Sequence, residues 1–236
     1  MDDTLYIVIP AYNEAENIRQ VICDWYPIIE KFGDKKSRLV IFDDGSQDET
    51  LSIMLAEQKL RPLFEPIKKS NSGHGATVLN AYKYAINHGA KFIFQTDSDG
   101  QTIPSDFEKF WRIRKSFDMI IGNRSERQDG FDRKIVSWIL KIVLRIIFGV
   151  KIVDPNTPFR LMNAETLKKY INKIPSDYNL PNILISVIYF KYKLSVKFLP
   201  ITFKSRVGGV NFINLRRIFA IGFQALKDFR NLSKTI

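Results

Sequence analysis

The sequence has few of the side chains that build disulfide frameworks and zinc sites. It contains one cysteine, Cys23, and two histidines, His74 and His88. A single cysteine excludes a disulfide framework and fits a reducing compartment. Cysteine and histidine are the usual zinc ligands, so a zinc site is not expected either. The chain also has no Walker-type glycine-rich loop, which disfavours a P-loop nucleotidase, and no recognisable Ser-His-Asp set.

Long hydrophobic runs are missing as well. Residues 135–148 are almost wholly apolar, but these 14 residues fall short of the roughly 20 that a membrane-spanning helix needs. The start of the chain, Met1-Asp2-Asp3, is acidic, so no cleavable signal is expected before the first strand. Internal repeats, low-complexity segments and long linkers are not found. We therefore expect one domain over residues 1–236, with residues 1–122 and 123–236 as its two halves.

The composition is that of a globular protein with an uneven charge. Of 236 residues, 45% are hydrophobic and 26% charged, which excludes disorder for the bulk of the chain. The net charge is +11. Residues 1–118 carry 15 basic and 18 acidic side chains, whereas residues 119–236 carry 21 and 7. The basic second half indicates contact with an anionic surface or a polyanion.

Strands alternate with helices along the first part of the chain, which predicts an α/β fold with an open, mostly parallel sheet flanked by helices. We expect strands at residues 5–10, 38–42, 63–67, 91–96 and 118–122, and helices at 14–31, 49–58, 76–88 and 135–148. Asn13 is expected to cap the first helix and Cys23 to lie in its core-facing side. Ligands bind at the carboxyl ends of such strands, so residues 12–14, 43–46, 71–75 and 97–101 should share one crevice.

The sharpest chemical signal is Asp97-Ser98-Asp99-Gly100-Gln101, directly after a predicted strand. Alternate side chains of an extended chain point the same way, so Asp97, Asp99 and Gln101 can converge. Their oxygens suit Mg²⁺ or Mn²⁺ carrying a diphosphate. The alternative is a pair of solvated turn aspartates. A calcium loop is excluded, because its sixth position is Thr102 instead of glycine and a strand precedes it.

The apolar stretch at residues 135–148 has two interpretations. It is either a buried core helix or an amphipathic helix lying in a membrane interface. We favour the interface, because basic residues surround the stretch. These are Arg133, Lys134, Lys141, Arg145 and Lys151. A second candidate for such a helix is residues 215–230.

Several motifs in order resemble those of family-2 inverting glycosyltransferases with the GT-A (Rossmann-like) fold. They are Val8-Ile9-Pro10-Ala11-Tyr12-Asn13-Glu14, Asp43-Asp44-Gly45-Ser46-Gln47-Asp48-Glu49-Thr50 and Asp97-Ser98-Asp99-Gly100-Gln101. Further segments are similar to polyprenyl-phosphate sugar synthases of the dolichyl-phosphate mannosyltransferase type. These are Gly122-Asn123-Arg124, Arg133, Asp154 to Arg160 and Lys204-Ser205-Arg206-Val207-Gly208-Gly209.

The resemblance implies a role for each matching residue. The nucleotide would contact Pro10, Tyr12, Glu14, Asp43, Asp44 and Asp97. The metal on the diphosphate would be held by Asp97, Asp99 and Gln101. The acceptor phosphate would be bound by Arg124, Arg133 and Arg206. The catalytic residues would be Asp99, Arg124, Arg133 and Asp154. Asp154 would act as a general base toward a sugar hydroxyl or, with a phosphate acceptor, orient neighbouring arginines, and both stay open.

The implied activity is transfer of a sugar from a UDP- or GDP-sugar to undecaprenyl or dolichyl phosphate. Residues 1–122 would be the nucleotide-sugar-binding half, and residues 123–236 the acceptor-binding, basic, membrane-interface half. A phosphomonoester has a second pKa of about 6, so at neutral pH it is largely a dianion and already a nucleophile. This explains why no dedicated general base is evident and why arginine, whose planar fork binds phosphate oxygens, recurs.

Two other functions are kept as alternatives. One is a soluble family-2 enzyme acting on a glycan or protein hydroxyl. The other is a basic nucleic-acid-binding module, since residues 189–193 interleave aromatic and lysine side chains. A strand with lysine on its solvent face explains those residues equally well, and we expect no nucleic-acid partner.

We expect the enzyme in the cytoplasm, peripheral on the inner face of the membrane. Family members often carry transmembrane helices after this domain, and residues up to Ile236 contain no such segment. A segment beyond Ile236, interfacial helices and a membrane-anchoring partner all stay open as means of attachment. The oligomeric state, including a homo-oligomer, stays open too.

Overall fold

The computed structural model describes residues 3–124 and 131–204, and only the backbone of residues 131–137. Seven described strands form one sheet in the order β3-β2-β1-β4-β6-β5-β7. Their bounds are β1 (Leu5–Ala11), β2 (Arg38–Asp43), β3 (Phe64–Lys68), β4 (Phe92–Gln95), β5 (Met119–Asn123), β6 (Arg160–Asn163) and β7 (Val196–Pro200). Within this described sheet only β6 runs antiparallel to its neighbours. The predicted open, mostly parallel sheet is confirmed.

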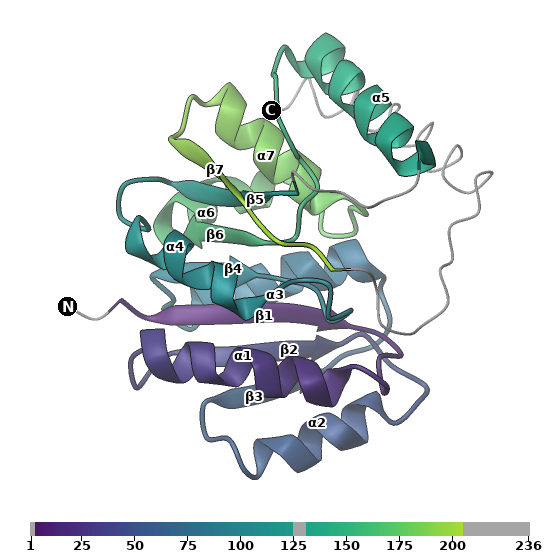
Figure 1. The fold of residues 1–236 in the computed structure, drawn as a ribbon, viewed down its shortest axis with the longest axis vertical. Coiled ribbons are helices and arrows are strands. Elements are labelled where there is room, and N and C mark those ends of the chain that lie inside the picture. The colour runs from purple at the N-terminus through teal and green to yellow at the C-terminus, as the bar shows by residue number, and fades with distance from the viewer. Residues whose placement is uncertain (1–2, 125–130, 205–236) are drawn as a thin grey trace.

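Helices cover both faces of the sheet (Figure 1). They are α1 (Ile18–Phe32), α2 (Thr50–Gln58), α3 (His74–Asn87), α4 (Phe107–Arg112), α5 (Phe131–Phe148), α6 (Ala164–Tyr170) and α7 (Pro181–Lys191), with short 3-10 helices at Pro104–Asp106 and Ile171–Lys173. Helices α1 and α4 lie on one face, and α3, α6 and α7 lie on the other. The central strand β1 is buried on both sides, which explains why it is a continuous apolar run.

The side chains of β1 divide between two apolar clusters. Leu5, Ile7 and Ile9 pack with residues of α1 and α4, whereas Tyr6 and Val8 pack with residues of α3 and α7. This alternation follows from the two-residue period of a strand. Packing on both faces fixes the position of the carboxyl end of β1 next to the carboxyl ends of β2 and β4.

Aromatic rings hold β4 against the segment that precedes β6. Phe94 lies between Trp25 and Phe159, with ring centroids 5.2 Å and 4.7 Å away. Phe107 of α4 closes the group at 4.9 Å from Phe94. All four side chains are buried, so this cluster anchors the end of β4, after which the Asp97-to-Gln101 motif begins.

Helix α5 packs on the rest of the protein with one face only. Leu144 and Phe148 are buried in the cluster that includes α7. Trp138 and Ile146 point away from it and are exposed. Within the described residues, no helix is both long and apolar enough to cross a membrane. The helix thus combines a packed face with an exposed apolar face that carries Lys141 and Arg145 at its side.

Two predictions about the first helix are wrong. The helix begins at Ile18, four residues later than expected, because Asn13 lies in a turn with φ 53° and its side-chain oxygen accepts from the backbone N–H of Gln47. Cys23 is exposed, since the buried stripe of α1 runs through Ile22 and Trp25 on the neighbouring positions.

The strand considered for residues 189–193 is also wrong. Residues 189–191 complete α7, and 192–193 form the turn after it. Burial on almost all sides makes α7 apolar without helical periodicity, so aromatic and β-branched residues suggested a strand. The second candidate interface helix, residues 215–230, lies outside the described residues.

Candidate active site

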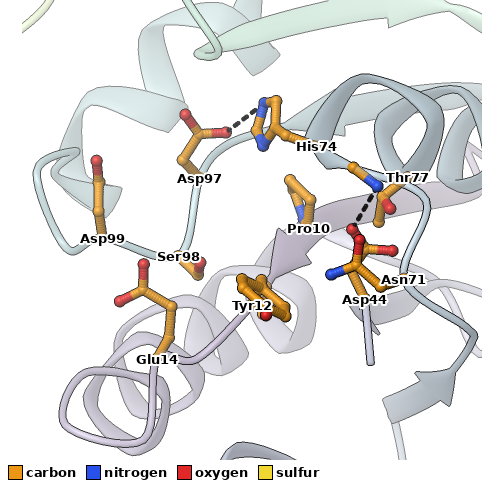
Figure 2. A pocket seen from close by; sticks show the side chains of 12 residues that line it. Pro10, Tyr12, Glu14, Asp44, Asn71, His74, Thr77, Asp97, Ser98 and Asp99 are labelled. Atoms are coloured by element: carbon orange, nitrogen blue, oxygen red, sulfur yellow. Dashed lines mark hydrogen bonds and ion pairs between the residues drawn. The ribbon is translucent and has the colours of Figure 1, made fainter. Parts of the chain in front are cut away.

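A cavity of about 380 Å³ opens at the carboxyl edge of the sheet. It is lined by Pro10, Ala11, Tyr12, Glu14, Asp44, Asn71, Gly73, His74, Thr77, Asp97, Ser98 and Asp99. Pro10 and Ala11 end β1, and the other lining residues follow β1, β2, β3 and β4, whose carboxyl ends lie side by side. The predicted crevice shared by these four segments is therefore confirmed (Figure 2).

The turn after β1 presents Tyr12 and Glu14 to the cavity. It is held by the β2–α2 loop, since Ser46 Oγ accepts from the Asn13 N–H at 2.9 Å and Thr50 Oγ1 accepts from the Glu14 N–H at 2.8 Å. The Tyr12 side chain is 44% exposed. An aromatic ring exposed at a cavity wall offers a flat apolar surface on which a nucleobase can stack.

Asp97 and Asp99 line the opposite end of the cavity from Asp44 (Figure 2). Asp97 Oδ1 lies 4.0 Å from Nε2 of His74, and the two side chains point toward each other. The backbone N–H of Gln101 donates to Asp99 Oδ1 at 3.1 Å, which fixes the turn between them. The structure thus brings both predicted metal-binding carboxylates to one cavity wall.

This pair of carboxylates suits a divalent ion that is completed by a ligand's own phosphates. The described part of the chain holds no group of three or more His, Cys, Asp or Glu side chains placed to bind a metal ion. Mg²⁺ in nucleotide sites commonly uses one or two carboxylates plus substrate phosphate oxygens. Gln101 does not line the cavity, and its side-chain amide donates to the carbonyl of Lys204 at 2.9 Å. Its role as a metal ligand stays a prediction.

Asp44 holds the loop that forms the third wall of the cavity. Its carboxylate accepts from Lys69 Nζ and, at 2.9 Å each, from the backbone N–H groups of Ser72 and Gly73. Burial raises the pKa of Asp44, but the hydrogen bonds from Lys69 and Ser72 outweigh it, so the pKa lies below its usual value. Asp44 is therefore kept ionised by the loop that it organises.

Replacing Asp44 with asparagine should destabilise the protein at neutral pH by about 1–3 kcal/mol, because buried donors lose a charged acceptor. Since the folded pKa is lowered, the contribution is complete above the unfolded value of about 3.9 and is lost as the pH falls through the folded pKa. Urea unfolding at pH 6 and pH 3 should show the difference between wild type and variant shrinking at the lower pH. An equal difference at both would contradict this assignment.

Asp43 does not reach the cavity wall. It is only 1% exposed, and its Oδ1 accepts from the Ser46 N–H at 3.2 Å. Its Oδ2 has no hydrogen-bond partner among the described residues. Asp43 therefore lies beneath the cavity at the end of β2, and its predicted contact with a nucleotide stays a prediction.

Arg124 and Asp154 form a second polar group at the same edge of the sheet. Nε and Nη2 of Arg124 donate to the two carboxylate oxygens of Asp154 at 2.9 Å and 2.8 Å. Both side chains are mostly buried. This geometry fits the orienting role considered for Asp154, and that role stays a prediction. Arg133 lies in α5 with its side chain undescribed, and Arg206 lies outside the described residues.

Comparison with known proteins decides the family. Residues 6–182, well over half of the chain, match the model of Glycosyl transferase family 2. This protein belongs to that family. It is a glycosyltransferase, and the predicted resemblance is confirmed.

Curated relatives of this family-2 glycosyltransferase include enzymes named for polyprenyl-type acceptors. It is 25% identical to the UDP-N-acetylglucosamine–dolichyl-phosphate N-acetylglucosaminyltransferase of Methanococcus voltae over 71% of this chain and 72% of the relative. It is likewise 25% identical to the polyprenol monophosphomannose synthase of Mycolicibacterium smegmatis, over 87% of this chain and 79% of that relative.

A solved structure shows the same fold at lower identity. Glucosyl-3-phosphoglycerate synthase from Mycobacterium tuberculosis, crystallised with Mn²⁺, UDP and glucosyl-3-phosphoglycerate, has a TM-score of 0.74 and 15% identity. The match covers 98% of this chain and 80% of that one. The predicted GT-A fold is thereby confirmed for this glycosyltransferase.

The sequence did not assign a role to several residues of the site. Lys69 and Thr77 carry no motif of their own, and Asn71 and His74 were expected at the crevice only as part of the 71–75 segment. Each becomes recognisable only once the loop after β3 folds back on Asp44 and toward Asp97. The glycines flanking His74 were the available signal, since Gly73 adopts φ 88° at the start of α3.

Arg160 is a further residue that sequence reasoning left unassigned beyond its motif. It is fully buried, and it donates to the carbonyls of Pro155, Thr157 and Asn182 at 2.7–3.2 Å. These bonds join the segment after Asp154 to the first turn of α7. Arg160 therefore shapes the loop that carries the partner of Arg124.

Proposed function

We propose that this glycosyltransferase transfers a sugar from a UDP- or GDP-sugar to a polyprenyl phosphate at a membrane surface, with inversion at the anomeric carbon. The observation that carries the proposal is the placement of two polar sites on one edge of the sheet. Asp97 and Asp99 line the cavity, and the Arg124–Asp154 pair follows the neighbouring part of the same edge. Relatives named as polyprenyl and dolichyl phosphate transferases support this choice of acceptor.

On the donor side, the exposed ring of Tyr12 would stack on the base, and Asp97 and Asp99 would hold Mg²⁺ or Mn²⁺. A cation bound there neutralises the negative charge that develops on the departing nucleoside diphosphate. A neighbour of the same fold crystallised with Mn²⁺ and UDP supports this donor chemistry. Glu14 and Asp44 line the remaining walls of the cavity.

On the acceptor side, a phosphomonoester dianion would attack the anomeric carbon directly. The new bond joins a phosphate oxygen to that carbon, and the bond from carbon to the donor's diphosphate oxygen breaks with its electron pair. No proton has to be removed, since the nucleophile is already anionic. Arg124, oriented by Asp154, would bind the phosphate and hold it in line.

The exposed face of α5 would bring the site to a lipid surface. Trp138, Ile139, Ile142 and Ile146 form an exposed apolar strip, and Lys141 and Arg145 are exposed beside it. Apolar side chains flanked by cations match the interface of a membrane containing anionic lipids. These features support a peripheral position on the membrane, which we propose to be on its inner face.

Substituting Ile146 by glutamate should weaken binding to liposomes of anionic phospholipid by about tenfold or more, because a buried side chain of this size contributes roughly 1.5–3 kcal/mol. The measurement is co-sedimentation with vesicles at fixed ionic strength. Leu60→Glu is the matched control, since Leu60 at 76% and Ile146 at 77% are equally exposed but Leu60 lies in the turn after α2. If both variants bound the liposomes equally well, α5 would not be part of the membrane-binding face.

The activity itself is tested by incubating labelled nucleotide sugars with undecaprenyl phosphate, Mg²⁺ and the protein, followed by organic extraction. Labelled lipid with one donor is the expected result. A panel of UDP- and GDP-sugars with Mn²⁺ in thermal unfolding selects that donor, since a bound ligand raises the midpoint. Transfer to soluble acceptors without any labelled lipid would favour the soluble enzyme instead.

A further inference from the structure

One aromatic side chain links the two polar sites. Phe203 lies after β7, and the centroid of its ring is 5.2 Å from the guanidinium carbon of Arg124, within the range of a cation–π contact. Its backbone forms an antiparallel bridge with Thr102, which directly follows the 97–101 motif. Phe203 therefore contacts the acceptor-side arginine with its ring and the metal loop with its backbone.

Two hydrogen bonds next to this bridge join Gln101 to Lys204. The Lys204 N–H donates to the Gln101 carbonyl at 2.8 Å, and the Gln101 side-chain amide donates to the Lys204 carbonyl at 2.9 Å. Thr102 is anchored in turn, because its hydroxyl lies 2.7 Å from that of Thr96 at the end of β4. The 202–204 segment is thus tied to the same loop that carries Asp97 and Asp99.

The contact occupies the face of the Arg124 guanidinium and spares its hydrogen-bonding edges. Asp154 takes Nε and Nη2 of Arg124, while the ring of Phe203 contacts the planar cation without using an N–H donor. Nη1 takes no part in the pair with Asp154. A guanidinium held by its face and one edge is preorganised to bind a phosphate through its remaining N–H donors.

The apolar core does not account for Phe203. Among the described residues, the two apolar clusters are formed without it, and its side chain is only half-buried. Building on the proposed function, we propose that Phe203 is a positioning residue: its ring holds Arg124 for the acceptor phosphate, at a place set by the metal loop.

The test compares Phe203→Leu with Phe203→Trp, because leucine keeps an apolar side chain and removes the π face, whereas tryptophan keeps that face. With farnesyl phosphate as the acceptor, Phe203→Leu should raise the acceptor KM roughly 3- to 30-fold, with the donor KM within about twofold of wild type. Phe203→Trp should restore the acceptor KM. In an Arg124→Met background, Phe203→Leu should not raise the acceptor KM further, because the cation that the ring contacts is absent. Equal impairment by leucine and tryptophan, or additivity with Arg124→Met, would overturn the proposal.

A second readout does not depend on turnover. The Nε–H resonance of Arg124, assigned by its loss in Arg124→Lys, should move downfield in Phe203→Leu as the ring-current shielding disappears. An unmoved resonance would overturn the role of Phe203 even if transfer to lipid is intact. Conversely, the proposed function would be overturned if the wild-type protein transferred no sugar to any polyprenyl phosphate. The Arg124 resonance would still report on the contact with Phe203 in that case.

Discussion

Replacing Asp99 with asparagine is expected to lower the rate of sugar transfer by about 10²- to 10³-fold. Asp99 lines the cavity, and asparagine keeps its size and its ability to accept from the Gln101 N–H while removing the negative charge. A neutral amide binds a divalent cation far more weakly, so the departing diphosphate loses its neutralising partner. The effect should appear in kcat, measured with saturating donor and acceptor.

Asp24→Asn is the matched control, because Asp24 is an exposed aspartate on α1, remote from the cavity. It should transfer sugar at the wild-type rate. In thermal unfolding, UDP with Mn²⁺ should protect wild type and Asp24→Asn but protect Asp99→Asn much less. Undiminished transfer by Asp99→Asn would remove this residue from the catalytic machinery.

Arg160→Met is expected to cause the largest loss of stability, about 3–5 kcal/mol of the free energy of unfolding. Methionine fills much of the volume of arginine but donates no hydrogen bond, so the buried carbonyls of Pro155, Thr157 and Asn182 lose their donor. The hydroxyl of Ser186, which also reaches Pro155 and Asn182, replaces only part of this. Urea unfolding followed by circular dichroism gives the measurement.

Arg112→Met provides the comparison, since Arg112 is a largely exposed arginine paired with Glu108 on α4. Exposed ion pairs contribute little, so its unfolding midpoint should stay close to wild type. A similarly small change for Arg160→Met would mean that the loop after Asp154 is held by other contacts. The acceptor KM of Arg160→Met, measured below its unfolding temperature, should rise as Asp154 and Arg124 lose their alignment.

The first hundred residues were largely predictable because their elements are locally encoded. The strands that became β1, β2 and β4 are short apolar runs bounded by proline or by Asp-Gly turns, and burial on both faces makes such runs continuous. The helix of residues 76–88 was displaced by only two residues at its start, since α3 begins at His74. Parallel order then followed from the alternation of strands and helices.

The second half was less predictable, for identifiable reasons. Helix α7 is buried on almost all sides, so it lacks the periodicity that marks a surface helix. Strand β6 has only four residues, begins with a buried arginine and is antiparallel between β4 and β5. Neither pattern is visible in one sequence, because both result from packing between distant segments.

The candidate site also has a part that the sequence predicted and a part that it did not. Asp97 and Asp99 are two residues apart at a strand end, so their shared position at the cavity was predictable. The pair of Arg124 with Asp154 spans 30 residues. The partnership of Phe203 with Thr102 depends on β7 lying at the sheet edge next to β5.

Local sequence alone determined the α/β class, the mostly parallel sheet, the crevice at its carboxyl edge and the acidic motif within it, because strand periodicity and turn chemistry act over a few residues. Only the tertiary structure decided which distant side chains meet there. Asp44 with the loop after β3, Arg160 with Asn182 of α7 and Phe203 with Arg124 are contacts between segments far apart in the chain. Such contacts form only when the whole chain folds, so no local sequence pattern indicates them.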